Sequence, residues 1–324
     1  MTKKIILITG ANGEIGKSLI KQLSNDNIII SLDIAHDDHI SPNIKKITGS
    51  ILDQNILDNI NKKYNLSEIY HLAAVLSSKA QKNPDFSNEV NYNGTINLLE
   101  LAKIQALKYQ NPIKFFFPSS IAVYNVINQN LNDIINEKNL SKNPITEYGK
   151  AKLKCEEIGI KKYLKNNVDF RCIRFPGIIS ASSKPTGGTS DYAPEMIHSA
   201  FLNKHYNCFV NNQTILPFIA MPDAISAIIN LMNAESNKIK SKIYNVTSFS
   251  PTVINFENKI KEFFPNFKLS YDIDLERQKI VDSWPSFIDK SLAKKEWFFS
   301  CNYNFDNLLE DYMIPSLKKY YNHE

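Results

Sequence analysis

The feature that most constrains the fold is a regular alternation of short apolar runs with segments of helical periodicity in the first half of the chain. The segment Glu14–Leu23, for example, repeats its apolar residues at helix spacing. Six apolar runs are predicted strands: Ile5–Thr9, Ile28–Leu32, Ile44–Ile47, Ile69–Leu72, Lys114–Phe117 and Phe170–Arg174. Strands that alternate with helices predict an α/β fold, a doubly wound parallel sheet of the Rossmann type with helices on both faces.

The first predicted strand runs into a glycine-rich turn, Gly10-Ala11-Asn12-Gly13-Glu14-Ile15-Gly16, which opens the first predicted helix. Glycine allows a tight turn and lets the backbone approach a pyrophosphate, toward which the helix N-terminus directs its N–H groups. An ordinary strand-to-helix turn is the alternative. The position between a strand and an amphipathic helix favours a dinucleotide site, to which the turn residues Gly10, Asn12, Gly13, Glu14, Ile15 and Gly16 contribute.

Asp33 ends the second predicted strand, 23 residues after Gly10. An acid at about this spacing accepts hydrogen bonds from the adenosine ribose, and it repels the extra phosphate of NADP. The pattern therefore predicts NAD as the cofactor.

Three residues form a candidate catalytic group. Tyr148 and Lys152 are four residues apart and share one face of a predicted helix from about Glu147 to Lys165. Ser120 follows the fifth predicted strand at the carboxyl edge of the sheet, where α/β sheets bind ligands. A lysine ammonium favours the phenolate of a tyrosine, so Tyr148 is predicted to be a base for an alcohol, and Ser120 to hydrogen-bond the reacting oxygen. A chance Tyr-x-x-x-Lys pair is the alternative.

The pattern changes after Pro176, where Ser180–Tyr192 is predicted to be a loop. We predict an NAD-binding domain over residues 1–176, to which residues 220–247 return. Residues 177–219 and 248–324 are predicted to form a smaller substrate-binding or lid domain.

Composition excludes several other classes of protein. The net charge of +5 comes from lysine and arginine spread along the whole chain, which argues against a nucleic-acid partner. Neither the 4 cysteines nor the 6 histidines have metal-ligand spacing, so no metal is predicted. No apolar run reaches the roughly 20 residues that span a bilayer. The first residues run directly into a strand pattern without a signal peptide, so we expect a cytoplasmic protein without a membrane partner.

These motifs resemble the extended short-chain dehydrogenase/reductase superfamily, and within it the short-chain type of L-threonine 3-dehydrogenase. The resemblance runs from Ile5 to beyond Trp297. Its specific blocks are Pro118–Tyr124, Arg174–Ser180, Gly187–Ala193, Met221–Ala224 and Arg277–Pro285. It implies oxidation of the β-hydroxyl of L-threonine to 2-amino-3-oxobutanoate, with NAD as acceptor and Tyr148 as base.

The resemblance also implies roles for individual residues. Ser50 and Ile51 would lie by the adenine, Leu72, Ala73 and Ala74 would line the cofactor with Tyr148 and Lys152, and Ile178 would meet the nicotinamide. The candidates for holding the substrate are Ser78, Ser120, Tyr148, Thr189 and Ser190, with Trp284 closing the pocket or lying in the core of the small domain. Relatives usually carry Asp where Ser50 stands and Thr where Ser190 stands. A homodimer through Asn88–Leu107 and Glu147–Lys165 is expected by the same analogy.

Two other functions stay open at this point. A nucleotide-sugar epimerase or dehydratase of the same superfamily would share the glycine turn and Tyr148, and it would need basic residues for a diphosphate, for which Arg277 is a candidate. A non-enzymatic NAD sensor would share the turn, although such proteins often lose the catalytic Tyr or Lys, and both are present here.

Overall fold

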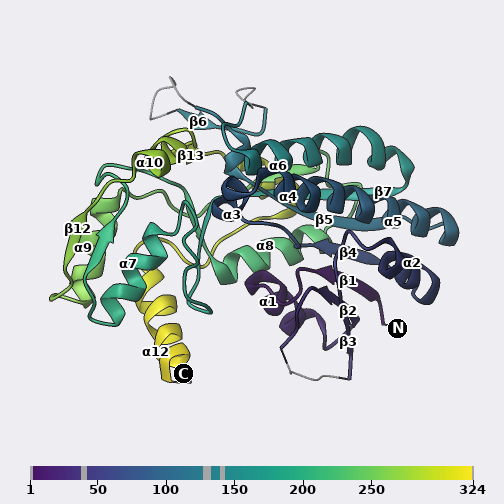
Figure 1. Cartoon of the computed structure of the whole chain (residues 1–324), viewed down its shortest axis with the longest axis horizontal. Coiled ribbons are helices and arrows are strands. Elements are labelled where there is room, and N and C mark those ends of the chain that lie inside the picture. Colours follow the sequence, from purple (N-terminus) through teal and green to yellow (C-terminus); the bar gives the residue numbers. More distant parts are fainter. Residues whose placement is uncertain (1–2, 38–41, 127–132, 139–142, 323–324) are drawn as a thin grey trace. The chain divides into compact units, whose positions relative to one another are not determined.

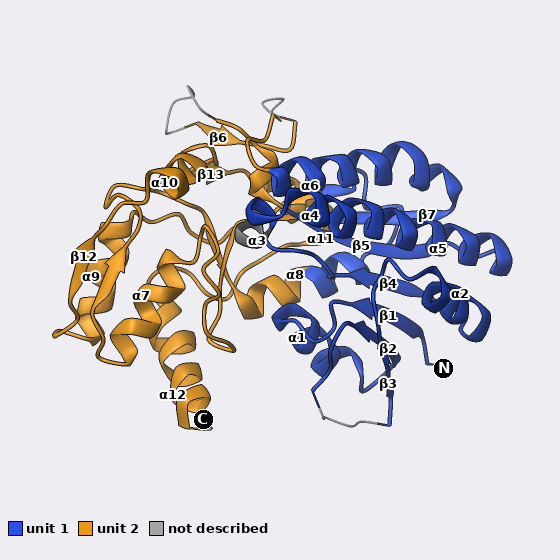
Figure 2. Cartoon of the chain, in the orientation of Figure 1, with its two compact units in different colours: residues 1–119, 147–173, 228–243 blue, residues 120–146, 174–227, 244–324 orange. Residues whose placement is uncertain are grey.

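The computed structural model describes residues 3–37, 42–126, 133–138 and 143–322 of the chain (Figure 1). The chain forms two compact units (Figure 2), each assembled from three segments. Unit 1 comprises residues 1–119, 147–173 and 228–243, and unit 2 comprises residues 120–146, 174–227 and 244–324. The assignment of a cofactor-binding and a substrate-binding role to separate domains stays a prediction.

A seven-stranded parallel sheet confirms the predicted fold class. Its order is β11-β7-β5-β4-β1-β2-β3. The strands are β1 (Ile5–Thr9), β2 (Ile28–Asp33), β3 (Ile44–Thr48), β4 (Glu68–His71), β5 (Ile113–Ser120), β7 (Val168–Phe175) and β11 (Ile243–Asn245). Their residues are mostly β-branched or aromatic, which suits a sheet covered on both faces.

The direction of each crossover between parallel strands decides on which face of the sheet a helix of unit 1 lies. Helix α1 (Glu14–Leu23) leads from β1 to β2, whereas α2 (Gln54–Lys63), α5 (Gly94–Tyr109) and α6 (Glu147–Ile158) lead to strands in the opposite direction across the sheet. Right-handed crossovers in opposite directions place helices on opposite faces (Figure 1). The direction reverses between β1 and β4, which is the place where such sheets bind ligands.

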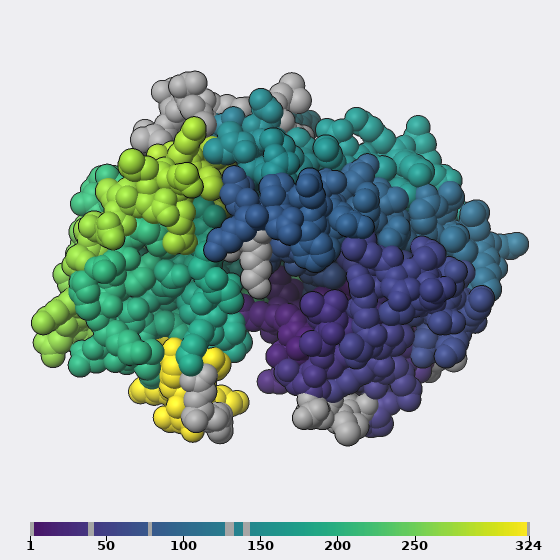
Figure 3. Space-filling model, in the orientation of Figure 1, coloured from purple at the N-terminus to yellow at the C-terminus, as the bar shows by residue number. Residues whose placement is uncertain are grey.

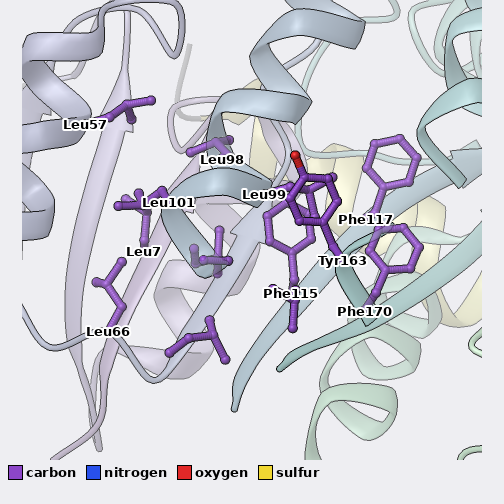
Figure 4. Close-up of a cluster of buried hydrophobic side chains, with 14 of the residues drawn as sticks. Leu7, Leu57, Leu66, Leu98, Leu99, Leu101, Phe115, Phe117, Tyr163 and Phe170 are labelled. Carbon is purple, nitrogen blue, oxygen red and sulfur yellow. The ribbon is translucent and has the colours of Figure 1, made fainter. Parts of the chain in front are cut away.

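A cluster of buried apolar side chains fills the space between the sheet and α2 and α5 (Figure 4). Leu7 of β1, Leu98 of α5 and Phe115 of β5 are all fully buried. The ring centroids of Phe115 and Phe170 stack 6.1 Å apart across β5 and β7. Each such side chain stabilises the fold by about 1.5–3 kcal/mol relative to exposure, so this cluster fixes the sheet that carries the candidate site.

Three helices differ from the prediction. The helix predicted at Glu147–Lys165 is α6 only as far as Ile158, and it is followed by a π-helical turn, Gly159–Tyr163, and a 3-10 turn, Leu164–Asn166. Helix α2 was not predicted, and it begins after Asp53, whose carboxylate accepts hydrogen bonds from the backbone of Asn55 and Ile56. The helix predicted at Asn88–Leu107 is instead α4 (Pro84–Asn88), a π-helical turn Glu89–Asn93, and α5. This turn carries a side-chain anchor described below, and π turns are often found at functional sites.

Unit 2 is built from shorter elements. Its strands form three two-stranded parallel sheets, β10-β8, β12-β9 and β13-β6. The strands are β6 (Ile134–Ile135), β8 (Gly177–Ile179), β9 (Tyr206–Cys208), β10 (Phe218–Ala220), β12 (Leu269–Tyr271) and β13 (Phe287–Ile288). Its helices are α7 (Tyr192–Phe201), α9 (Val253–Phe263), α10 (Leu275–Asp282), α11 (Ser291–Trp297) and α12 (Ile314–Asn322). Helix α8 (Met221–Asn233) begins in unit 2 and ends in unit 1. The short helix α3 (Ser77–Lys82) belongs to unit 1. The terminal helix α12 is visible at the surface of unit 2 (Figure 3).

Within unit 1, a single arginine joins β7 to the end of α8. The guanidinium of Arg171 is fully buried and donates hydrogen bonds to the carbonyls of Leu231, Met232 and Ala234 at 2.6, 3.0 and 2.8 Å. It also donates to the Asp169 carboxylate at 2.6 Å. Burial alone would raise the pKa of Asp169, but the hydrogen bonds from Arg171 and Ser236 and the nearby positive charges lower it to about 2. Only the planar fork of arginine reaches all these acceptors at once.

The Arg171→Met variant is therefore expected to lose about 3–5 kcal/mol in free energy of unfolding at neutral pH, because three carbonyls lose the guanidinium donor and the buried Asp169 carboxylate keeps only Ser236 and Lys242. Urea denaturation measures this loss. The exposed Lys165→Met is the matched control and should change stability by less than about 0.5 kcal/mol. Because the pKa of Asp169 is depressed in the folded state, its stabilising effect is present above about pH 4 and fades toward about pH 2, so acidification should narrow the difference. A loss near that of the control would contradict the role of Arg171.

Candidate active site

The glycine turn after β1 is shaped by two close backbone approaches. Gly10 has φ of +64°, and a Cβ there would lie 2.6 Å from the backbone nitrogen of Ala73. A Cβ on Gly16 would lie 2.5 Å from the carbonyl oxygen of Gly10. Both positions therefore require glycine, which holds the turn against the loop that follows β4.

The end of β2 is tied to the same turn. One carboxylate oxygen of Asp33 accepts a hydrogen bond from the backbone N–H of Asn12 at 2.8 Å. Gly13 is the N-cap of α1 without a side-chain cap, and Glu14 and Ile15 begin the helix. A narrow glycine cradle, a helix N-terminus and a carboxylate beside them fit a dinucleotide, with phosphates at the turn and a ribose at Asp33.

The other residues predicted to bind the cofactor lie in several elements. Ser50 follows β3, and its hydroxyl accepts a hydrogen bond from the Leu52 N–H at 3.1 Å. The Ile51 side chain is buried in the core cluster. Leu72, Ala73 and Ala74 form the partly exposed loop after β4, and Ile178 lies in β8 of unit 2. Their contact with a cofactor stays a prediction.

A chain of hydrogen bonds links the loop after β4 to the π-helical turn. The N–H of Ala73 donates to the Thr9 hydroxyl at 3.3 Å, and this hydroxyl lies 2.9 Å from Nδ1 of His71. Nε2 of His71 lies 2.8 Å from the hydroxyl of Thr95, which donates to the carbonyl of Asn91 at 2.7 Å. Because the Thr95 hydroxyl donates its proton to Asn91, it must accept a hydrogen bond from His71. The ring proton of His71 is therefore assigned to Nε2.

This histidine is a structural link and not an acid or base at neutral pH. Burial, together with the charge of Lys152, lowers the pKa of His71 to about 3, so the ring stays neutral. The side chain of Asn91 completes the link, because its oxygen accepts from Val75 N–H at 2.7 Å and its nitrogen donates to Val75 O at 2.9 Å. Thr9 and Thr95 were missed, and the spacing of Thr95 four residues after Asn91 is the signal that was available.

Tyr148 and Lys152 lie on α6, as predicted. Nζ of Lys152 is 5.5 Å from the centroid of the Tyr148 ring and 4.6 Å from that of Phe117. The ammonium donates a hydrogen bond to the carbonyl oxygen of Pro118 at 2.7 Å. The end of β5 therefore fixes the lysine charge beside the tyrosine ring.

The electrostatics of this pair are set by desolvation. Burial raises the pKa of Tyr148 to about 12 and lowers the pKa of Lys152 to about 8. In the protein alone the ammonium thus loses its proton before the phenol does. A positive charge brought close to this pair would lower the pKa of Tyr148, and it would also lower the pKa of Lys152.

The two serines at the end of β5 have different surroundings. The Ser119 hydroxyl is buried and donates to the carboxylate of Glu156 on α6 at 2.6 Å, a contact that the sequence did not predict. Ser120 is the next residue, and its hydroxyl oxygen accepts from Ala122 N–H at 3.1 Å at the start of a short 3-10 turn. Glu156 is four residues after Lys152, a spacing that could have indicated this second contact.

The predicted substrate residues other than Tyr148 lie in unit 2 and on α3. Thr189 is buried and Ser190 partly exposed in the loop before α7. Trp284 is buried and lines a cavity of about 570 Å³ within unit 2. The side chain of Ser78 lies outside the described residues.

Among the residues that the structure describes, no group of three or more His, Cys, Asp and Glu side chains is arranged to hold a metal ion. None of the described helices combines the length and apolar character that a bilayer crossing requires.

The chain matches the family described as "NAD dependent epimerase/dehydratase family" over residues 6–247. A protein of Staphylococcus epidermidis named "Uncharacterized epimerase/dehydratase" is 36% identical, and the match covers 98% of each chain.

Two solved structures are similar over nearly the whole chain. A monomeric L-threonine 3-dehydrogenase from a metagenome is 35% identical with a TM-score of 0.85, covering 97% of this chain and 99% of that chain. The L-threonine dehydrogenase of Clostridium difficile is 34% identical with a TM-score of 0.89, covering 98% and 99%. The first of these proteins is named as monomeric. The homodimer expected of this chain stays a prediction.

The position of Asp33 predicts a preference between dinucleotides that is measurable by binding alone. NADH should bind more tightly than NADPH, because a carboxylate repels the extra phosphate. Asp33→Asn removes the charge but keeps an acceptor for Asn12, and it should narrow the preference by about 1–4 kcal/mol, roughly five- to a thousand-fold in the ratio of Kd values.

Cofactor fluorescence titration gives the two Kd values for each variant. Asp26→Asn, at an exposed position before β2, is the matched control and should keep the preference of the unaltered protein. Equal affinities for NADH and NADPH in the unaltered protein would rule out the role given to Asp33.

Proposed function

The chain belongs to the NAD dependent epimerase/dehydratase family, and from this premise we propose that it is an NAD-dependent L-threonine 3-dehydrogenase. It would oxidise the β-hydroxyl of L-threonine to 2-amino-3-oxobutanoate. The observation that carries the proposal is the similarity, at 34–35% identity over nearly the full length, to two structures named L-threonine dehydrogenases. The Tyr148–Lys152 pair on α6 supplies the residues for this chemistry.

Tyr148 is the proposed proton acceptor for the substrate hydroxyl. NAD, when bound, supplies a hydride acceptor with a positively charged nicotinamide ring. The residues of the chain account for the rest: desolvation holds Tyr148 protonated with a pKa of about 12, and the Lys152 ammonium lies against its ring. Added positive charge lowers the pKa of the phenol, so in the loaded site Tyr148 would release its own proton to solvent and, as the phenolate, accept the proton of the substrate hydroxyl.

Lys152 is proposed to stabilise the phenolate without taking the proton itself. Its hydrogen bond to the carbonyl oxygen of Pro118 holds the ammonium at the end of β5, so the position of the charge is fixed although the lysine side chain is long. The Ser120 hydroxyl, whose oxygen is already a local acceptor, keeps its proton for donation to the reacting oxygen. Thr189, Ser190, Trp284 and Ser78 remain the proposed contacts of the amino acid.

The nucleotide-sugar alternative is disfavoured because the arginines of the chain already make contacts within the chain. A diphosphate is recognised well by the planar fork of arginine, and the chain has arginine only at positions 171, 174 and 277. Arg171 holds Asp169 and the end of α8, and buried Arg174 donates to the Tyr124 hydroxyl at 2.7 Å. Arg277 is also engaged within the chain, as described below. The sensor alternative is disfavoured because Tyr148 and Lys152 are both present.

The direct test is to mix the protein with NAD and L-threonine and follow formation of NADH. We expect turnover with L-threonine and weaker turnover with L-serine, which lacks the β-methyl group, or D-threonine. Thermal-shift measurements with nucleotide sugars run in parallel. Stabilisation by a nucleotide sugar without turnover of L-threonine would replace the proposal with the epimerase alternative.

Tyr148→Phe is expected to lower kcat by about 10²–10⁴-fold, the usual effect of losing a general base, while leaving the Kd for NADH nearly unchanged. Tyr109→Phe, at the far end of α5, is the matched control and should retain full activity. If Tyr148→Phe turned over L-threonine at the normal rate, another group would have to be the base.

A further inference from the structure

Arginine is rare in this chain, and two of the three arginines, Arg171 and Arg174, are fully buried. Lysine and arginine together number 38, yet only three of these residues are arginine. Arg171 and Arg174 both sit where a buried guanidinium donates to several groups at once. The same reasoning leads to Arg277, the third arginine, which lies on α10 in unit 2.

Arg277 makes two contacts that require a planar guanidinium. Its Nη2 donates to the carbonyl oxygen of Gly188 at 2.6 Å. The guanidinium carbon lies 3.1 Å from the centroid of the Phe209 ring, so the face of the group is stacked on the aromatic face. A lysine ammonium retains the charge but cannot stack a flat group on Phe209 while it donates sideways to Gly188.

The carbonyl held by Arg277 belongs to a turn with strict backbone demands. Gly187 has φ of +83°, and a Cβ on Gly188 would lie 2.8 Å from an Asp191 carboxylate oxygen. That carboxylate accepts from the N–H of Gly188 at 2.7 Å and of Thr186 at 3.2 Å. Asp191 thus holds the N–H side of the turn, and Arg277 holds its carbonyl side from 89 residues further along the chain.

We propose that Arg277 is a positioning residue that fixes the Gly187–Ser190 turn and thereby the hydroxyls of Thr189 and Ser190 for an amino-acid substrate. This inference rests on the proposed function, because those two hydroxyls are its proposed substrate contacts. It also gives Arg277 a different role from the diphosphate contact that the alternative function would require. Residues of the turn contact the substrate, and Arg277 acts through them.

The test compares Arg277→Lys and Arg277→Met with the unaltered protein. Loss of a charge-assisted hydrogen bond at the turn should raise KM for L-threonine roughly tenfold or more, with kcat changed far less and the Kd for NADH unchanged. Lys should rescue little of the loss, since it keeps only the charge. Lys279→Met, an exposed position two residues away on α10, is the matched control and should keep the normal KM.

Hydrogen exchange provides a second readout that does not depend on turnover. Amides of residues 186–191 should exchange faster in both Arg277 variants, whereas those of β1 and α1 should not change. Normal exchange in this turn together with a normal KM would overturn the inference. If the unaltered protein does not oxidise L-threonine, the proposed function fails by itself, and faster exchange in the Arg277 variants would still establish that Arg277 holds the turn.

Discussion

The burial of the Lys152 ammonium is the constraint on which the candidate site depends. Lys152 is only 5% exposed, and its hydrogen bond goes to the carbonyl of Pro118, with the rings of Phe117 and Tyr148 on its sides. A buried cation is costly, and here the cost appears as a pKa lowered to about 8. A fold selected for stability alone has no reason to keep a charge in this place. The proposed role of this charge, which is to act on the neighbouring phenol of Tyr148, accounts for it.

The surroundings of this lysine are organised by the strand ends of unit 1. The carboxyl ends of β1, β4 and β5 supply Thr9, His71 and Pro118, so one edge of the sheet carries the glycine turn, the neutral histidine and the lysine acceptor. The chain of hydrogen bonds through His71 connects this edge to the π-helical turn at Asn91. Because the ring remains neutral, this link keeps the same donors and acceptors across the physiological pH range.

Local patterns in the sequence were sufficient to predict the parallel sheet and to place the proposed base on a helix. The β1 strand and helix α1 follow from apolar periodicity and the glycine turn, and both are found with the predicted bounds. Contacts between distant segments could not be predicted in this way. The Arg277–Gly188 hydrogen bond, the Ser119–Glu156 pair and the side-chain anchor of Asn91 each depend on tertiary packing. The π turn at Glu89–Asn93 has the same cause, since it interrupts a run whose periodicity reads as one helix.

The central claim, that Tyr148 takes the proton of the β-hydroxyl while hydride leaves the β-carbon of L-threonine, is tested most directly with L-threonine deuterated at that carbon. The account predicts that the deuterium appears in the reduced cofactor and that its formation slows by a primary isotope effect in single-turnover experiments. Reduced cofactor without deuterium would show that hydride leaves another carbon, and no reduced cofactor at all would remove L-threonine as the substrate.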